Sequence, residues 1–223
     1  MTSATPIVHK TRTHMVVEAL REMILSGQIK AGEPLRQSQL AESLNVSRIP
    51  VREALLQLEA EGLVKFEAHK GATATELSAA QAEELFHIRC LLEPDLLARS
   101  IPHLTEEQLA HSAALLVELD EALEASASIH TWADLNKEFH LSLYVGADRP
   151  QTLELVQTLN THADRYIRLH LMRDDNVRRA KGEHKTLLDA CRDKDIDRAV
   201  RLLREHIAEA GAEIVALIGK RHV

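Results

Sequence analysis

Three histidines and one asparagine in the second half of the chain are spaced so that their side chains can meet. Asn136 and His140 are four residues apart in WADLNKEFHLSLY, so they share one face if this segment is a helix. His184 lies ten residues before a helix break near residue 194, and His206 lies twelve residues after it. At about 1.5 Å per residue, both lie about 15 to 18 Å from the break on two helices that fold back on each other. The spacing therefore allows a cluster of three imidazoles and one amide oxygen.

This donor set suits a divalent metal ion, with zinc the first candidate and nickel another. The chain has thirteen histidines, so any single one is weak evidence, and two alternatives stay open. The histidines can instead act as neutral pocket donors to an anionic ligand, without a metal. Three histidines around zinc with an open position also form a catalytic arrangement, which would make the protein a metal-dependent hydrolase.

A hydrolase would need a general base beside the metal, and the sequence does not supply one convincingly. Glu138 lies about 200° around the helix from Asn136, and Glu183 faces in a different direction from His184. We therefore expect a binding site and not an enzyme.

A second group of residues, near the N-terminus, has the chemistry to contact DNA. Residues 37–64 read QSQLAESLNVSRIPVREALLQLEAEGLV, in which a short helix, a turn and a longer helix form a helix-turn-helix pattern. Arg48 and Arg52 project together from the N-terminal end of the longer helix, and Arg is well suited to bidentate contact with guanine in the major groove. Ser47 is expected to begin this helix and to help hold a phosphate. Pro50 falls in its first turn, where a missing N–H costs nothing.

Two segments with strand character follow, at 63–67 and 72–77, and they flank the turn His69-Lys70-Gly71. Three helices followed by a small hairpin predict a winged helix-turn-helix over residues 1–77. The tip of the hairpin, with Lys70 and Gly71, is placed to reach the neighbouring minor groove or the DNA backbone.

The rest of the chain is helical in its pattern. Aromatic residues make up only 3% of the chain, a composition that favours helix over strand. We predict six helices, at about 78–101, 105–124, 130–146, 150–173, 176–192 and 195–219. The predicted fold is therefore mostly α, with an antiparallel helical bundle over residues 78–223.

Charge and hydropathy narrow the function further. The net charge is −7, but residues 1–75 carry nine Lys or Arg against eight Asp or Glu, whereas residues 76–223 carry eighteen against twenty-six. The acidic second half is not expected to contact the phosphates of DNA. No apolar run approaches the roughly 18 residues that span a membrane, and the first residues lack the apolar core of a signal peptide. We therefore expect a cytoplasmic protein with no membrane partner.

The run NVSRIPVREALLQLEAEGLV resembles the GntR family of bacterial regulators. The resemblance extends upstream through AGEPLRQSQLAESL and downstream to HKGATATEL, so that it covers residues 12–77. It implies a DNA-binding winged helix in which Arg36 lies near the DNA backbone. The positions that it places at the DNA fall on Ser47, Arg48, Pro50, Arg52 and Gly71.

Residues 78–219 are similar to the all-helical ligand-sensing FCD domain of the FadR branch of that family, through LLEPDLLA, LNKEFHLSLYVGADRP and GEHKTLLDACRDKDIDRAVRLLREHI. The resemblance implies a metal site on Asn136, His140, His184 and His206. The family often has Asp at the first of these positions, and the neutral Asn136 is a poorer ligand. Six helices also resemble the VanR-type subgroup more than the seven-helix FadR type.

The resemblance also implies a mechanism. Effectors in this family are commonly small carboxylates, and a metal with an open coordination position can take one directly. Arg89 and Arg165 are candidate partners for such an anion, and the alternative for each is an ordinary salt bridge. The resemblance implies a homodimeric repressor that binds a pseudo-palindromic, double-stranded operator, since two-fold symmetry requires matching half-sites.

Overall fold

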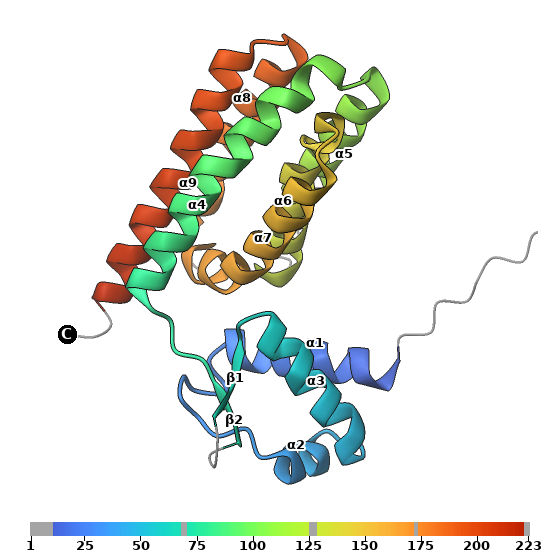
Figure 1. Cartoon of the computed structure of the whole chain (residues 1–223), viewed down its shortest axis with the longest axis vertical. Coiled ribbons are helices and arrows are strands. Elements are labelled where there is room, and N and C mark those ends of the chain that lie inside the picture. Colours follow the sequence, from blue (N-terminus) through green and yellow to red (C-terminus); the bar gives the residue numbers. More distant parts are fainter. Residues whose placement is uncertain (1–10, 68–70, 125–128, 172–173, 221–223) are drawn as a thin grey trace, which may run out of the picture. The chain divides into compact units, whose positions relative to one another are not determined.

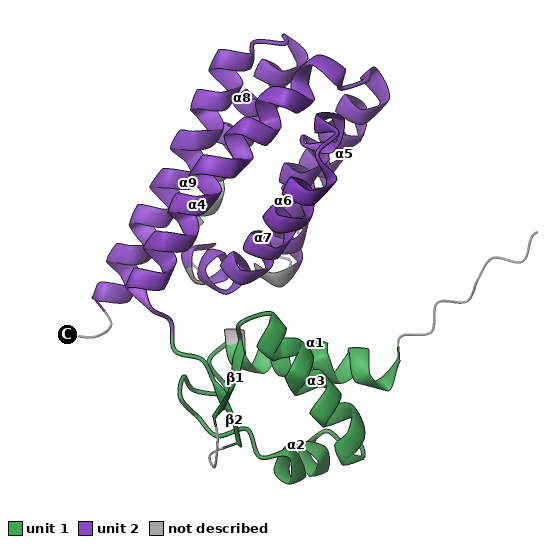
Figure 2. Ribbon diagram, in the orientation of Figure 1, with its two compact units in different colours: residues 1–76 green, residues 77–223 purple. Residues whose placement is uncertain are grey.

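The computed structural model describes residues 11–67, 71–124, 129–171 and 174–220. The chain divides into two compact units, Met1–Glu76 and Leu77–Val223, each with its own apolar core (Figure 2). As predicted, the fold is mostly helical, with a winged helix-turn-helix first and a helical bundle second. No helix in the described part of the chain is long and apolar enough to cross a membrane.

In the described part of the first unit, three helices accompany a two-stranded hairpin (Figure 1). The strands pair antiparallel, with Val64 opposite Ala74. The second strand, predicted at 72–77, ends at Ala74. The elements are α1 (Arg12–Leu25), α2 (Gln37–Ser43), α3 (Arg48–Ala60), β1 (Val64–Glu67) and β2 (Gly71–Ala74).

The helix-turn-helix is held by one apolar face on each helix. In α3 the residues Val51, Leu55 and Leu58 recur at helical spacing and are fully buried. An ion pair between Arg21 of α1 and Glu61, just beyond α3, adds two hydrogen bonds of 2.9 and 2.7 Å. Together these contacts fix the direction in which the opposite face of α3 points.

The second unit is a bundle of six α-helices within the described residues, with two short 3-10 turns, η1 (Ile101–His103) and η2 (Val145–Ala147) (Figure 1). Helices α4 and α9 lie side by side, and α8 and α9 form an antiparallel pair. The helices are α4 (Ala79–Ser100), α5 (Glu106–Glu124), α6 (Ile129–Ser142), α7 (Pro150–Leu171), α8 (Asp174–Arg192) and α9 (Ile196–Gly219).

The third helix of the bundle is shorter than predicted. It was expected to reach about residue 146, but α6 ends at Ser142. The chain turns there so that Gly146 can approach the end of α4, where its N–H donates to Ser100 Oγ at 2.9 Å. A Cβ on Gly146 would lie 2.7 Å from the Ser100 carbonyl oxygen. This long-range contact is incompatible with a helix that simply continues.

Helices α4 and α9 approach each other closely at a glycine. A Cβ added to Gly211 of α9 would lie 2.7 Å from the Cβ of Phe86 on α4, closer than such atoms are found. Phe86 is itself buried and lies next to Arg89 along α4, with the guanidinium 5.0 Å from its ring centroid. The close crossing therefore positions residues that line the site described next.

Candidate metal centre and nucleic-acid interface

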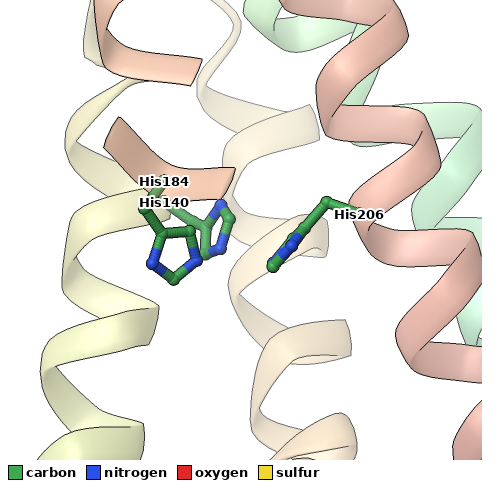
Figure 3. A group of neighbouring side chains, drawn as sticks. All are labelled: His140, His184 and His206. Atoms are coloured by element: carbon green, nitrogen blue, oxygen red, sulfur yellow. The ribbon is translucent and has the colours of Figure 1, made fainter. Parts of the chain in front are cut away.

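The three histidines predicted to meet do meet, and they come from three different helices (Figure 3). One ligand nitrogen from each of His140, His184 and His206 lies within 4.8 Å of the others. The ring centroids are 4.9 to 5.2 Å apart. His140 is on α6, His184 on α8 and His206 on α9.

The antiparallel α8–α9 pair explains how residues so far apart in sequence become neighbours. The turn between these helices places Lys194 in the left-handed region, with φ of 56°. Asp195 then caps α9, since its side chain accepts a hydrogen bond from the Arg198 N–H at 3.1 Å. The turn sits where the sequence predicted it, so the heights of His184 and His206 along the two helices match.

Buried nitrogens without partners mark this cluster as a ligand site. Within the described residues, His140 Nδ1 and both ring nitrogens of His184 are buried and make no hydrogen bond. Leaving one such group unsatisfied costs about 1–3 kcal/mol. Burial, with smaller contributions from neighbouring histidines, holds the pKa of His140 and of His184 well below its usual value. Both are therefore neutral at pH 7, the form that binds a metal, so the residues present fit a divalent ion.

Glu183 contacts the cluster through His206, a contact that was not predicted. Its Oε2 lies 2.5 Å from His206 Nδ1. This hydrogen bond is the main cause of the lowered pKa of the Glu183 carboxyl. A carboxylate in this position fixes the orientation of a metal-binding imidazole and leaves Nε2 for the ligand. The signal was present in the sequence, because Glu183 and His206 lie eleven and twelve residues from residue 194.

A pocket opens beside the histidines. Asn136, His140 and His206 line it together with Arg89. The rest of the wall combines aromatic and aliphatic side chains with further polar ones, which are His170, Arg179, Glu183 and Glu209. Asn136 is buried, at 7% exposure. The pocket lining therefore includes three of the four predicted metal ligands and one predicted effector contact, and the fourth ligand, His184, lies in the cluster with His140 and His206. The apolar part of the lining includes Phe86, Trp132, Ile167, Leu171 and Ile207.

Arg89 is held in this wall by a buried ionic network. Its side chain is 5% exposed, and its Nε donates to Glu93 Oε1 at 2.6 Å. The hydroxyl of Tyr144 donates to the other oxygen of Glu93 at 2.8 Å. Burial and the nearby Glu93 raise the pKa of Tyr144 well above its usual value, so the hydroxyl keeps its proton. Glu93 thus binds the guanidinium of Arg89 through Nε and fixes the orientation of its two other nitrogens.

Arg165 does not line this pocket. Its Nη2 donates to the Tyr166 hydroxyl at 2.9 Å, and its guanidinium lies over the Tyr166 ring. A different arginine, Arg179, lines the pocket, where it pairs with Glu213 at 2.6 Å and with Glu183 at 3.4 Å. The sequence analysis missed Arg179, although its position four residues before Glu183 on one helix was visible.

The candidate DNA-binding residues lie on the exposed end of α3 and near it. Arg36, Arg48 and Arg52 are exposed, and no ion pair holds them within the part of the chain that the structure describes. Ser47 occupies the N-cap of α3, but its side chain makes no capping hydrogen bond, so its hydroxyl is left for another partner. Pro50 is buried in the first turn, where it shapes the helix and offers no exposed surface.

The wing is described in part. Gly71 is exposed and begins β2 with φ of 80°, a left-handed conformation that favours glycine. Lys70 lies outside the described residues.

Comparison with known proteins agrees with both halves of this picture. The model of "Bacterial regulatory proteins, gntR family" matches residues 12–73, and that of the FCD domain matches residues 84–209. The "Nta operon transcriptional regulator" of Aminobacter aminovorans is 32% identical over 197 residues, 88% of this chain and 91% of the relative. The "HTH-type transcriptional repressor RspR" of Escherichia coli is 26% identical over 202 residues, 89% and 87% of the two chains.

A solved structure of E. coli McbR/YncC superposes with a TM-score of 0.71 at 25% identity, over 96% of this chain and 99% of that one. The relatives are transcriptional regulators and not enzymes, which argues against the hydrolase alternative. The predicted resemblance is confirmed: this chain belongs to the GntR family of bacterial DNA-binding transcription regulators and carries a C-terminal FCD domain.

Proposed function

We propose that this regulator is a cytoplasmic repressor that binds a pseudo-palindromic, double-stranded operator as a homodimer. A small carboxylate bound in the second unit controls its affinity for that operator. A divalent metal, zinc first among the candidates, is held beside the carboxylate by Asn136, His140, His184 and His206. The relative RspR of Escherichia coli is a transcriptional repressor, which supports this direction of regulation.

The unpartnered nitrogens of His140 and His184 carry the metal proposal. Burying these polar nitrogens without a hydrogen bond costs free energy. Apolar neighbours do not compensate for this cost, whereas a bound cation does. When bound, a divalent ion supplies a Lewis-acidic position that accepts a carboxylate oxygen. Glu183 orients His206 toward the same point. Asn136 offers an amide oxygen, and its neutrality predicts weaker binding than a carboxylate would give.

The chemistry of the pocket supports a carboxylate effector. Glu93 occupies the Nε edge of Arg89, so the two Nη atoms are those that meet an anion, and a guanidinium fork matches the two oxygens of a carboxylate. Arg179 also lines the pocket, although its charge is paired with Glu213 and Glu183. The ring of Trp132 and its apolar neighbours suit a short hydrocarbon part.

Control of DNA binding follows from the ordinary rules of linkage. A ligand changes operator affinity only if it binds one arrangement of the dimer better than another. Two copies of α3 must reach matching half-sites at a fixed spacing. A carboxylate that favours an arrangement with another spacing therefore releases the operator.

Metal content and mass test the first part. Protein purified without a histidine tag is expected to contain about one divalent metal per chain and to have twice the 24.9 kDa mass of the chain in a native mass spectrum. Glu183→Gln is expected to weaken metal affinity about 10- to 100-fold, since supporting carboxylates contribute that much. A protein that binds carboxylates with no metal present would establish the metal-independent sensor instead.

A screen of small carboxylates tests the second part. Each compound is added to the protein bound to DNA selected from random sequences, and release is measured by fluorescence anisotropy. Arg89→Lys keeps a positive charge beside Glu93 but loses the guanidinium fork, so it should respond at least tenfold more weakly. Arg165→Lys is the matched control, because Arg165 does not line the pocket, and it should respond as the wild type does. Equal responses from both variants would contradict the role of Arg89.

A further inference from the structure

An exposed apolar side chain in the first turn of α3 points in the middle of the direction that the outward face of this helix takes. Ile49 is 70% exposed, the highest value among the exposed large hydrophobic residues in the described part of the chain. It lies nine residues before Leu58, and nine residues correspond to about 180° around a helix. Since Leu58 is completely buried, Ile49 points directly away from the core of the first unit.

The charged neighbours of Ile49 belong to the same turn of α3. Arg52 is three residues further on and therefore about 60° away around the helix, and both side chains are exposed. Glu53, on the other side, already accepts a hydrogen bond from Thr13 Oγ1 at 2.7 Å. The N-terminal turn of α3 thus presents an isoleucine next to an arginine that no ion pair holds within the described residues.

A single exposed hydrophobic residue is common on protein surfaces and by itself needs no explanation. The position of Ile49 makes it informative. In helix-turn-helix proteins the N-terminal residues of the second helix meet base edges in the major groove. The apolar group that the bases present in that groove is the C5-methyl of thymine. An isoleucine at the centre of this face has no hydrogen bond to offer and so can discriminate bases by this methyl.

We propose that Ile49 selects a thymine in each half-site of the operator, through contact with its methyl group, beside the base pair that Arg52 contacts. This inference rests on the proposed entry of α3 into the major groove. Burying one methyl-sized apolar group is worth roughly a three- to tenfold change in affinity. The contact therefore tunes sequence preference, while the arginines supply the larger share of binding.

Leu56 offers a matched comparison on the same helix. It is 49% exposed and lies seven residues after Ile49, about 20° away around the helix but about 10 Å further along it. Leu56 is therefore an exposed apolar residue on the same face, but away from the end of α3 that meets the base edges.

The experiment uses full-length protein and a DNA sequence that it selects from a random pool. Each thymine of one half-site is replaced in turn by deoxyuridine, which removes only the methyl group, and dissociation constants are measured. The wild type should lose roughly three- to tenfold at one thymine. Ile49→Ala should bind the unmodified DNA more weakly by a similar factor and should not respond to that replacement. Ile49→Val and Leu56→Ala should both keep the response.

The proposal is overturned if no thymine replacement affects the wild type, or if Ile49→Ala responds as the wild type does. A different result would contradict the proposed entry of α3 into the major groove. In that case Arg52→Ala would bind the selected DNA as tightly as the wild type does. That result would remove α3 from the groove and the Ile49 contact with it. Since Ile49 is exposed, circular dichroism melting of Ile49→Ala should match the wild type and exclude a folding defect.

Discussion

The two candidate sites of this regulator are built in opposite ways. On α3 the arginines proposed to contact DNA, Arg48 and Arg52, are exposed, and within the described residues no ion pair holds them. In the bundle, Arg89 is almost completely buried and is bound to Glu93, which in turn is bound to Tyr144. The first surface is open to a large ligand from solution. The second lies inside the bundle, where Arg89 has its own partners but, within the described residues, His140 Nδ1 and both ring nitrogens of His184 have none.

This difference separates affinity from stability. Removing an exposed arginine takes away only the contacts that it makes with DNA. Removing one member of a buried pair leaves the other charge uncompensated in the core, which destabilises the protein even without ligand.

Glu93→Ala should produce the largest effect, a loss of about 3–5 kcal/mol in the free energy of unfolding of the second unit, because Arg89 would keep a buried charge without its partner. Trp132 is the only tryptophan of the chain and lies in this unit, so its fluorescence during urea unfolding reports the effect. Asp95→Ala removes an exposed pair with Arg99 on the same helix and should change little. Similar losses in both variants would contradict the distinction.

Arg52→Ala should behave in the opposite way. We expect a loss of about 1–3 kcal/mol in binding to the selected DNA, since one bidentate base contact is worth that amount. Melting of the variant, followed by circular dichroism, should be unchanged. Arg36→Ala, at a position expected near the DNA backbone, should weaken binding to all sequences alike and reduce its salt dependence. A destabilised Arg52→Ala would show that this arginine has a structural partner.

The sequence was most informative where the place of a residue follows from helix periodicity or from the position of a turn. The helical spacing of Val51, Leu55 and Leu58 matches the buried face of α3, and the turn near residue 194 predicted that His184 and His206 lie at similar heights. Periodicity and turn residues are local properties, and so they can be interpreted without the fold.

Other contacts between helices were not predictable in the same way. The early end of α6 depends on the approach of Gly146 to Ser100, which lies 46 residues earlier in the chain. Arg165 does not line the pocket, and the residues of α7 that do so depend on how this helix packs against α4, α6, α8 and α9. Such packing depends on the whole core, which no single segment encodes.

Gly211→Ala should destabilise the second unit by about 1–3 kcal/mol, because the added methyl group meets Phe86 in a core that cannot expand freely. Gly182→Ala on α8 is the matched control, since a Cβ there meets no atom within 4 Å. Alanine should stabilise that helix by roughly 0.5–1 kcal/mol. Urea unfolding followed by Trp132 fluorescence measures both, and opposite signs are expected. Equal signs would mean that the α4–α9 crossing can relax.

His184→Leu should have the smallest effect in metal-free protein, a gain of roughly 1 kcal/mol at pH 7, because it removes two buried nitrogens that lack partners. The same change should abolish metal binding. The folded pKa of His184 is depressed, so below the unfolded value of about 6.5 the unfolded chain binds protons that the folded chain does not. Stability of the chelated wild type should therefore fall as the pH falls from about 7 toward 5. In His184→Leu the decline should be shallower, with His140 still contributing. An equal decline in the two proteins would show that His184 is charged when folded, and would remove the basis for a buried neutral ligand.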